Sequence, residues 1–284
     1  MLRAGHTYTL TVKRISDFGL YLADDEGEQE VLLPNRYVSL GDREGDRIEV
    51  FVYHDSQDRL VATTRKPALR SGEAGFLRVV DRTIHGVFLD WGLEGKDLFM
   101  PNRNRQGTVA TGSMQLVYIY EDSVTGRCVA TSKLRQFVNN DDLSDVAPNQ
   151  QVDILVAVRV ESGYRVIIDN RHWGMIYDNQ MFSRVGIGDR MTGYVQRITD
   201  DNRIDIILRR PGFDGVQDSA GRLLSALERS GGFLPVGDRS TPEQIARHTQ
   251  MSKKLFKRSL GMLLRQGAVE TVMDGIRLVK RQPK

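Results

Sequence analysis

The chain has 284 residues and a net charge of +3, and its 40% apolar and 27% charged residues are typical of a globular protein. No apolar run reaches the roughly 20 residues that a membrane-spanning helix needs, and the first residues lack the apolar core of a secretory signal. Cys128 is the only cysteine, so an internal disulfide is excluded, and we expect a cytoplasmic protein in a reducing compartment with no membrane partner.

A frame of residues recurs along the chain up to about residue 213. It consists of a glycine followed 15 residues later by a closing dipeptide, and it occurs as Gly19 with Pro34-Asn35, Gly86 with Pro101-Asn102 and, in a worn copy, Gly163 with Asp178-Asn179. A second glycine lies 11 residues after each proline, at Gly45 and Gly112. We therefore predict four domains, spanning residues 1–67, 70–135, 149–212 and 214–284.

Each copy of the frame holds short runs of β-forming residues separated by polar turns. In the first copy they cover residues 8–14, 18–23, 31–33, 48–53 and 60–64, and the second copy has the same order. In the third copy they cover residues 152–160, 164–168, 175–177, 191–198 and 204–208. Five strands in about 60 residues, without a long helical period, predict a small closed barrel in each copy.

Aromatic residues gather around the glycine of the first two copies. Phe18 and Tyr21 are three residues apart, so a regular strand would place them on opposite faces, whereas a bulge at Gly19 would bring both to one face. His85 and Phe88 occupy the equivalent places in the second copy. Two flat side chains on an exposed face form a platform for bases, at about 1–3 kcal/mol per stacked base. The alternative is that these aromatic residues belong to the core.

Charged residues at the last turn of each copy complete the candidate site. Arg59 and Arg127 stand where the last strand opens, from which each can reach a phosphate. Asp55 and Asp122 precede them, and we expect these carboxylates to hold the arginines or to accept from a base or a ribose 2′-hydroxyl. Together with the aromatic residues, they predict a site for single-stranded RNA.

This pattern resembles the S1 RNA-binding domain, an OB-fold module. The family signature is an aromatic-Gly-apolar-aromatic-apolar strand, a Gly-Asp turn, and an Asp followed by an Arg around the last turn, which here are residues 18–22, Gly45-Asp46, Asp55 and Arg59. The second copy matches at residues 85–89, Asp122 and Arg127, but its Gly112-Ser113 lacks the acid. Leu33 and Met100 replace the usual His of the third strand. The resemblance implies tandem five-stranded OB-fold barrels that bind RNA.

The third copy has lost the aromatic pair. Ser162 and Arg165 stand at the places of Phe18 and Tyr21. We therefore expect a degenerate barrel that serves as a spacer or, alternatively, uses Trp173 and Tyr177 in place of the lost pair. The polar and acidic residues 136–148 in front of it are expected to form a linker.

After about residue 212 the periodicity changes from strand to helix. We expect three helices, with N-terminal caps at Asp218, at Ser240 in a capping box with Glu243, and at Ser252. Two strand-like runs then flank Asp274-Gly275, a two-residue hairpin signal. Three helices followed by a β-hairpin predict a winged helix, so the fold class is mainly β with a C-terminal α+β module.

The basic excess of the chain belongs to this last module. Residues 1–213 carry 27 Lys and Arg against 30 acidic residues, whereas residues 214–284 carry 13 against 7. The third helix holds no acidic residue and several basic ones, among them Lys253, Lys254, Lys257 and Arg258. Lysines give affinity for a phosphate backbone without reading bases. The pattern therefore fits RNA phosphates, the groove of duplex DNA, a protein partner or a solvated face.

Three barrels followed by a winged helix resemble, over the whole length, the conserved virulence factor B family of bacterial RNA-binding proteins. The Leu32-Leu33-Pro34-Asn35 closure and the Ser252-Lys253-Lys254 start of the third C-terminal helix add to this resemblance. What it implies is a cytoplasmic protein that influences gene expression after transcription, through contact with RNA.

No motif predicts catalysis, a cofactor or a metal site. The five histidines are scattered, none shares a ligand-spaced motif with Cys128, and no phosphate-binding glycine loop occurs. Asp141, Asp142 and Asp145 are the densest carboxylates and a weak metal candidate. Our first hypothesis is a non-enzymatic binder of single-stranded RNA with no small-molecule substrate. The alternatives are a regulator that binds duplex DNA through the winged helix, with the barrels as sensor or docking modules, and a protein scaffold.

Overall fold

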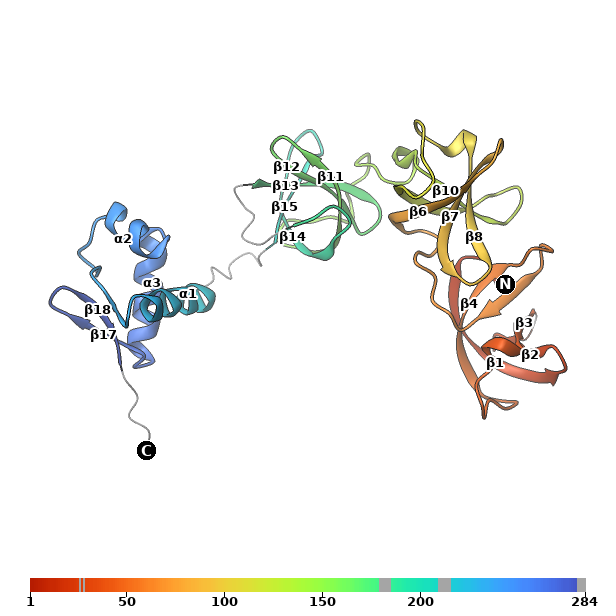
Figure 1. Ribbon diagram of the computed structural model, residues 1–284, viewed down its shortest axis with the longest axis horizontal. Coiled ribbons are helices and arrows are strands. Elements are labelled where there is room, and N and C mark those ends of the chain that lie inside the picture. The colour runs from red at the N-terminus through yellow and green to blue at the C-terminus, as the bar shows by residue number, and fades with distance from the viewer. Residues whose placement is uncertain (26, 28, 179–184, 209–215, 280–284) are drawn as a thin grey trace. The chain divides into compact units, whose positions relative to one another are not determined.

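The computed structural model describes residues 1–25, 27, 29–178, 185–208 and 216–279. The chain separates into two compact units, Met1–Leu208 and Arg209–Lys284 (Figure 1). The first unit contains three five-stranded modules and the second contains three helices with a small sheet. This confirms the predicted fold class.

The first module is a closed barrel. Its strands are β1 (His6–Ser16), β2 (Gly19–Ala23), β3 (Glu30–Pro34), β4 (Arg47–His54) and β5 (Leu60–Thr63), in the order β1-β2-β3-β5-β4. Alternate residues of these strands point inward, and Leu10, Leu22 and Leu33 are fully buried in the core. The barrel closes through one parallel pair, Leu32 with Val61.

The second module differs from the predicted closed barrel at its seam. Its strands are β6 (Ala74–Arg82), β7 (Gly86–Leu93), β8 (Lys96–Pro101), β9 (Met114–Glu121) and β10 (Cys128–Thr131), in the order β10-β9-β6-β7-β8. The outer strands β8 and β10 lie side by side without a hydrogen-bonded pair. Because a single residue pair closes the first barrel, the loss of that one pair is enough to leave this sheet open.

The third module is again a closed barrel. Its strands are β11 (Gln151–Val160), β12 (Gly163–Ile168), β13 (His172–Tyr177), β14 (Arg190–Ile198) and β15 (Ile204–Ile207), in the order β11-β12-β13-β15-β14. Its core is aliphatic, with Val156, Ile168 and Ile176 fully buried.

The glycine of the frame has the same structural role in all three modules. A Cβ atom at Gly19, Gly86 or Gly163 would lie 2.0, 2.3 or 1.9 Å from the carbonyl oxygen of Leu33, Met100 or Ile176, respectively. These positions need glycine because the neighbouring strand approaches too closely for any side chain.

Two details of the frame are corrected by strand pairing. Gly19 pairs with Pro34 and Gly86 with Pro101, whereas Gly163 pairs with Tyr177. The closing dipeptide of the third copy is therefore Tyr177-Asp178, one residue before the predicted one, whose Asn179 lies outside the described residues. The bulge predicted at Gly19 is also wrong, because Gly19 begins β2 in a regular pair.

The bulges lie instead on the preceding strand of each module. They fall at Lys13 in β1, Val80 in β6 and Ala157 in β11, each six residues before the frame glycine. A bulge increases the local twist and bends the strand. The three modules thus share a strand geometry as well as a sequence frame.

The predicted linker between the second and third modules is a packed connector. Phe137 stacks on Tyr118 with ring centres 4.5 Å apart, and Val138 is fully buried. Leu134 and Val138 join a core cluster with Leu155 and Ala157 of the third barrel. Apolar side chains within this stretch therefore hold the two barrels together. The polar composition of the segment gave no indication of this packing.

The first two modules also share a core. Phe51 of the first barrel meets Trp91 of the second edge to face, with ring centres 5.5 Å apart. The indole N–H of Trp91 donates to the carbonyl of Leu69 at 2.8 Å. Phe51, Tyr53 and Val61 belong to the same buried cluster as the core of the second module.

The second unit is the predicted winged helix. It consists of α1 (Val216–Arg229), β16 (Phe233–Leu234), α2 (Pro242–Thr249), α3 (Lys253–Arg265), β17 (Val269–Val272) and β18 (Gly275–Leu278), with sheet order β16-β18-β17. Phe256 and Leu260 of α3 pack into its core. Within the described residues, no helix is both long and apolar enough to cross a bilayer.

The predicted helix ends of this unit are partly correct. Ser252 caps α3, as predicted, by accepting from the N–H of Leu255. The capping box of α2 is shifted by one residue, because Thr241 and Gln244 form it in place of Ser240 and Glu243. Asp218 lies inside α1, which begins two residues earlier. The hairpin turn is also shifted, since Val272 pairs with Gly275 and leaves Met273 and Asp274 as the turn.

Candidate nucleic-acid interface

The first barrel exposes Phe18 at the tip of the turn between β1 and β2. Phe18 is 73% exposed. The turn is held from below, because Asn35 donates its side-chain amide to the carbonyl of Asp17 at 2.6 Å and its backbone N–H to the carbonyl of Phe18 at 3.1 Å. A large apolar side chain is thus presented to solvent on a braced loop, where a base can stack on it.

Tyr21 lies on β2 next to this turn, but its ring is covered. The guanidinium carbon of Arg14 is 3.4 Å from the ring centre. Arg14 also donates to Glu30 from two nitrogens, both at 3.0 Å. On this face a base reaches the ring of Tyr21 only if Arg14 moves, or else it stacks on the planar guanidinium itself.

The pair Asp55 and Arg59 forms as expected at the last turn of the first barrel. Arg59 donates to one carboxylate oxygen of Asp55 at 3.0 and 2.8 Å, and Gln57 donates its N–H to the other oxygen at 2.9 Å. Burial acts to raise the pKa of Asp55, but the hydrogen bonds from Arg59 and Gln57 outweigh it and lower the pKa. The side chain of Arg59 is 66% exposed, so it remains accessible to a phosphate.

The second barrel pairs Phe88 with a residue that the sequence reasoning missed. Phe88 on β7 lies opposite Phe99 on β8, with ring centres 5.1 Å apart. His85 occupies the exposed turn before β7, at the place of Phe18. The signal for Phe99 was present, because two antiparallel strands that pair Gly86 with Pro101 must also pair residues 88 and 99.

The expected pair of Asp122 and Arg127 does not form. Asp122 is buried, accepts two backbone N–H groups of its own turn, and receives a hydrogen bond from Arg103 at 3.0 Å. The N–H of Thr125 is the largest of the interactions that lower the pKa of Asp122. Arg127 instead donates to Asp58 of the first barrel at 2.6 Å. The longer turn of the second copy accounts for the change, since it leaves Arg127 directed towards the neighbouring barrel.

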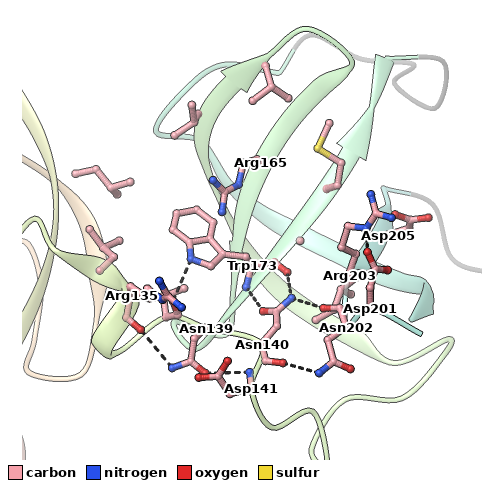
Figure 2. A pocket seen from close by; sticks show the side chains of 18 of the residues that line it. Arg135, Asn139, Asn140, Asp141, Arg165, Trp173, Asp201, Asn202, Arg203 and Asp205 are labelled. Atoms are coloured by element: carbon pink, nitrogen blue, oxygen red, sulfur yellow. Dashed lines mark hydrogen bonds and ion pairs between the residues drawn. The ribbon is translucent and has the colours of Figure 1, made fainter. Parts of the chain in front are cut away.

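A groove of about 980 Å³ lies on the corresponding face of the third barrel, and residues of the connector and the second barrel complete its lining (Figure 2). Arg165 places its guanidinium carbon 4.3 Å from the ring centre of Trp173. Asn140 of the connector accepts the backbone N–H of Trp173 at 2.7 Å and donates to its carbonyl at 2.9 Å. Ser162 and Tyr177 line the same groove. The two aromatic residues named as replacements for the lost pair therefore lie together on this face.

The third helix of the winged helix carries the predicted cations. Lys254, Lys257 and Arg258 are exposed, and Lys253 is half-buried. Lys257 forms an ion pair with Asp238 at 2.9 Å. Met273, at the tip of the β17–β18 hairpin, is fully exposed. The helix and the hairpin thus have the form of a winged-helix nucleic-acid surface.

Comparison with known families agrees with this geometry. The S1 domain model matches residues 4–65 and 72–133, and the model of the CvfB-like winged helix domain matches residues 221–278. The chain thus combines two S1 domains with a CvfB-like winged helix domain. Both modules are nucleic-acid-binding domains, so the partner of this CvfB-like chain is a nucleic acid. The third barrel lies outside the two S1 matches.

Related proteins align with the CvfB-like chain over most of its length. The protein YitL of Bacillus subtilis is 29% identical over 274 residues, which cover 94% of this chain and 91% of YitL. Conserved virulence factor B of Staphylococcus aureus strain USA300 is 22% identical over 84% of this chain and 81% of its own length. A Streptococcus pneumoniae crystal structure, described as a multidomain protein with nucleic acid binding domains, is 21% identical, covers 97% of this chain and 98% of its own, and has a TM-score of 0.40.

The carboxylates near the connector are engaged in structural contacts. Asp145 accepts from Arg171 at 2.7 Å and lies 3.1 Å from the Nε2 of the buried His172. Asp142 accepts the N–H of Ser144 at 2.9 Å, and this bond is the main cause of its lowered pKa. Across the described part of the chain, no three His, Cys, Asp or Glu side chains gather as metal ligands.

Proposed function

We propose that this CvfB-like chain is a cytoplasmic, non-enzymatic protein that binds single-stranded RNA and acts in post-transcriptional control of gene expression. The proposal rests on a combination of an aromatic residue and an arginine that recurs on all three barrels. Phe18 and Arg59 are exposed on the first barrel, Phe88 and Arg127 line one pocket of the second, and Arg165 lies over the ring of Trp173 on the third. Rings take the faces of unpaired bases and arginines take phosphates, a combination typical of single-strand binding.

Stacking and counterion release contribute separately to the affinity. Each stacked base contributes about 1–3 kcal/mol and is little affected by salt. Each phosphate neutralised on a single strand makes the slope of log K against log salt more negative by about 0.7. The barrels are therefore expected to supply the stacking term, while α3 of the winged helix contributes mainly to the salt dependence.

A second candidate function is favoured by the shape of the C-terminal unit. A basic third helix followed by a hairpin is the arrangement that places a helix in the major groove of duplex DNA. The exposed residues Lys254 and Lys257 present point charges, whereas base discrimination usually needs Arg, Asn or Gln in bidentate contact. We therefore rank duplex DNA behind single-stranded RNA as the partner.

Fluorescence anisotropy with a labelled single-stranded RNA and a duplex DNA of equal length tests this ranking. The full chain is expected to prefer the single strand at physiological salt. The triple variant Lys253→Gln, Lys254→Gln, Lys257→Gln should make the salt slope shallower by up to about 2 and keep the single-strand preference. A duplex preference that disappears in this variant would assign the function to the winged helix and overturn the proposal.

The platform itself is tested by Phe18→Ala with Tyr21→Ala. The double variant should weaken single-stranded RNA binding by at least about tenfold, because one stacked base is lost, and should leave the salt slope unchanged. Leu40→Ala serves as the matched control, since Leu40 is an exposed apolar residue of the same module that lies outside the predicted platform. Binding by the double variant as tight as that of Leu40→Ala would refute the platform.

A further inference from the structure

The second barrel carries a pocket of about 400 Å³, and one residue of the first barrel lies in its lining. This volume lies within the range of small-ligand sites, roughly 300–1,000 Å³. Its lining includes Phe88, Phe99, Trp91, Lys96 and Arg127 of the second barrel and His54 of the first. The pocket thus lies where the first barrel meets the second.

The walls of the pocket suit a flat ring. Phe88 and Phe99 stand 5.1 Å apart with their planes tilted by 42°, so they offer two inclined aromatic surfaces. Trp91, which is 2% exposed, lies behind them. Burial raises the pKa of the Cys128 thiol to about 12, so this neutral side chain adds apolar surface to the lining.

His54 gives the pocket an unsatisfied polar group. It ends β4 of the first barrel, and its Nδ1 atom is one of three buried side-chain N or O atoms in the described part of the chain that have no hydrogen-bond partner. Burial lowers the pKa of His54, so its ring is neutral near pH 7 and Nδ1 is a donor or an acceptor according to the tautomer. Buried polar atoms almost always have a partner. Nδ1 itself has almost no accessible surface, so a ligand in the pocket supplies that partner once the His54 ring rotates.

Two basic side chains of the second barrel, Arg127 and Lys96, line the pocket. Arg127 donates to Asp58 of the first barrel at 2.6 Å, and Lys96 donates to the carbonyl of Asp55 at 3.4 Å. Burial, followed by the charge of Arg127, lowers the pKa of Lys96. Both cations are therefore anchored on the first barrel's last turn while they line a pocket that a phosphate group can approach.

We propose that one unstacked base of a single strand enters this pocket, packs against Phe88 and Phe99 of the second barrel, and is read at its edge by His54 of the first barrel. Arg127 and Lys96 hold the phosphate of the same nucleotide. The inference rests on the proposed function, since it takes binding of a single strand as given. It adds that the first barrel supplies a specificity-determining residue to a site on the second barrel, so that the two modules form one nucleotide site.

The two tryptophans of the chain allow a direct test. In a Trp173→Phe variant, Trp91 is the only remaining indole and lies against the pocket. Labelled pentamers of adenylate, cytidylate and uridylate are titrated, and anisotropy and Trp91 emission are recorded in the same samples. We expect Trp91 emission to change in parallel with anisotropy, and one pentamer to bind more tightly than the other two.

The reading role of His54 is tested by His54→Ala in the same background. Loss of one hydrogen bond to a base should weaken the preferred pentamer by about tenfold and the others much less. His248→Ala, an exposed histidine of the other unit, is the matched control. Phe99→Leu, which keeps the strand apolar but removes the ring, should reduce the affinity for all pentamers and the response of Trp91.

The outcomes separate this inference from the proposed function. Unchanged Trp91 emission in samples whose anisotropy reports a bound pentamer overturns the pocket and leaves single-strand binding intact. Equal losses for all three pentamers in His54→Ala overturn base reading by that residue. Absence of an anisotropy change with any pentamer or longer single strand refutes the proposed function, and the pocket inference with it.

Discussion

The faces of the first and second barrels are built on the same frame, yet they present their aromatic residues differently. In the first, Phe18 stands free at the tip of a turn while Tyr21 lies under the guanidinium of Arg14. In the second, Phe88 packs against Phe99 and both line a pocket that His54 of the neighbouring barrel borders. The same strand positions therefore produce an exposed ring in one module and a pocket in the other.

The cross-strand neighbours account for the difference. Tyr21 is paired with Arg14 on one side and Leu32 on the other. Phe88 is paired with Asp81 and Phe99 at the same positions. An arginine can lie flat on a ring, whereas an aspartate cannot, and a second phenylalanine extends the apolar surface. The surface that each barrel presents thus depends on the residues beside the signature as much as on the signature itself.

The largest effect is expected where the two faces are alike. Gly19→Ala would bring a Cβ atom to 2.0 Å from a backbone carbonyl oxygen, and Gly86→Ala to 2.3 Å. Each should therefore reduce the free energy of unfolding by about 3 kcal/mol or more. Gly95→Ala is the control, because Gly95 has φ +70° but no atom within 4 Å of its Cβ position, and it should cost only about 1 kcal/mol. Equal losses for all three in urea unfolding would contradict the close-approach explanation.

A smaller effect distinguishes the two aromatic residues of the first barrel. Phe18→Ala should reduce the affinity for a single strand by about 1–3 kcal/mol, whereas Tyr21→Ala should reduce it by less than about 1 kcal/mol, because Arg14 covers the tyrosine ring. In an Arg14→Gln background the ring is free, and the cost of Tyr21→Ala should rise. Anisotropy titrations of the parent, Tyr21→Ala, Arg14→Gln and the double variant form a double-mutant cycle. A cost of Tyr21→Ala that is the same in both backgrounds would show that Arg14 does not limit access to the ring.

The smallest effect is expected from the ion pair that joins the two barrels. Asp58 and Arg127 are about half exposed, so a double-mutant cycle with Asp58→Asn and Arg127→Gln should give a coupling in thermal unfolding below about 1 kcal/mol. Arg70 and Glu73, paired within one turn at 2.7 Å, provide a control pair that does not join barrels. A coupling of several kcal/mol between Asp58 and Arg127 would mean that the pair, and not the shared apolar core, holds the barrels together.

The sequence predicts most of the fold because the spacing of its recurring residues aligns the three copies with one another. The glycine frame and the last strands place five strands in each module, and the helix caps and basic helix indicate the winged helix. The errors are local, at the bulge, the third closing dipeptide, the α2 capping box and the hairpin turn. The last three are displacements of one residue, which is within the usual uncertainty of element ends. The bulge lies six residues earlier on the preceding strand, where pairing between strands, invisible in the local pattern, decides its position.

The candidate site is predicted less completely, because it depends on contacts between modules. Asp55 and Arg59 lie in one turn, and their pairing follows from spacing alone. Arg127 pairs with Asp58, 69 residues earlier in the chain, and no local pattern indicates that partner. The connector is similar, since Phe137 and Val138 are two apolar residues in an acidic stretch and their burial depends on the barrel on either side.

The contact between the frame glycine and the facing carbonyl also bears on how ancient duplications are detected. The third barrel keeps Gly163 and the bulge six residues before it, although it has lost the aromatic pair and the Pro-Asn closure. The close approach of the strands is thus kept in a copy that lacks the aromatic pair. A search for further copies of this barrel in other sequences should therefore weight the glycine and its distance from the bulge above the aromatic signature.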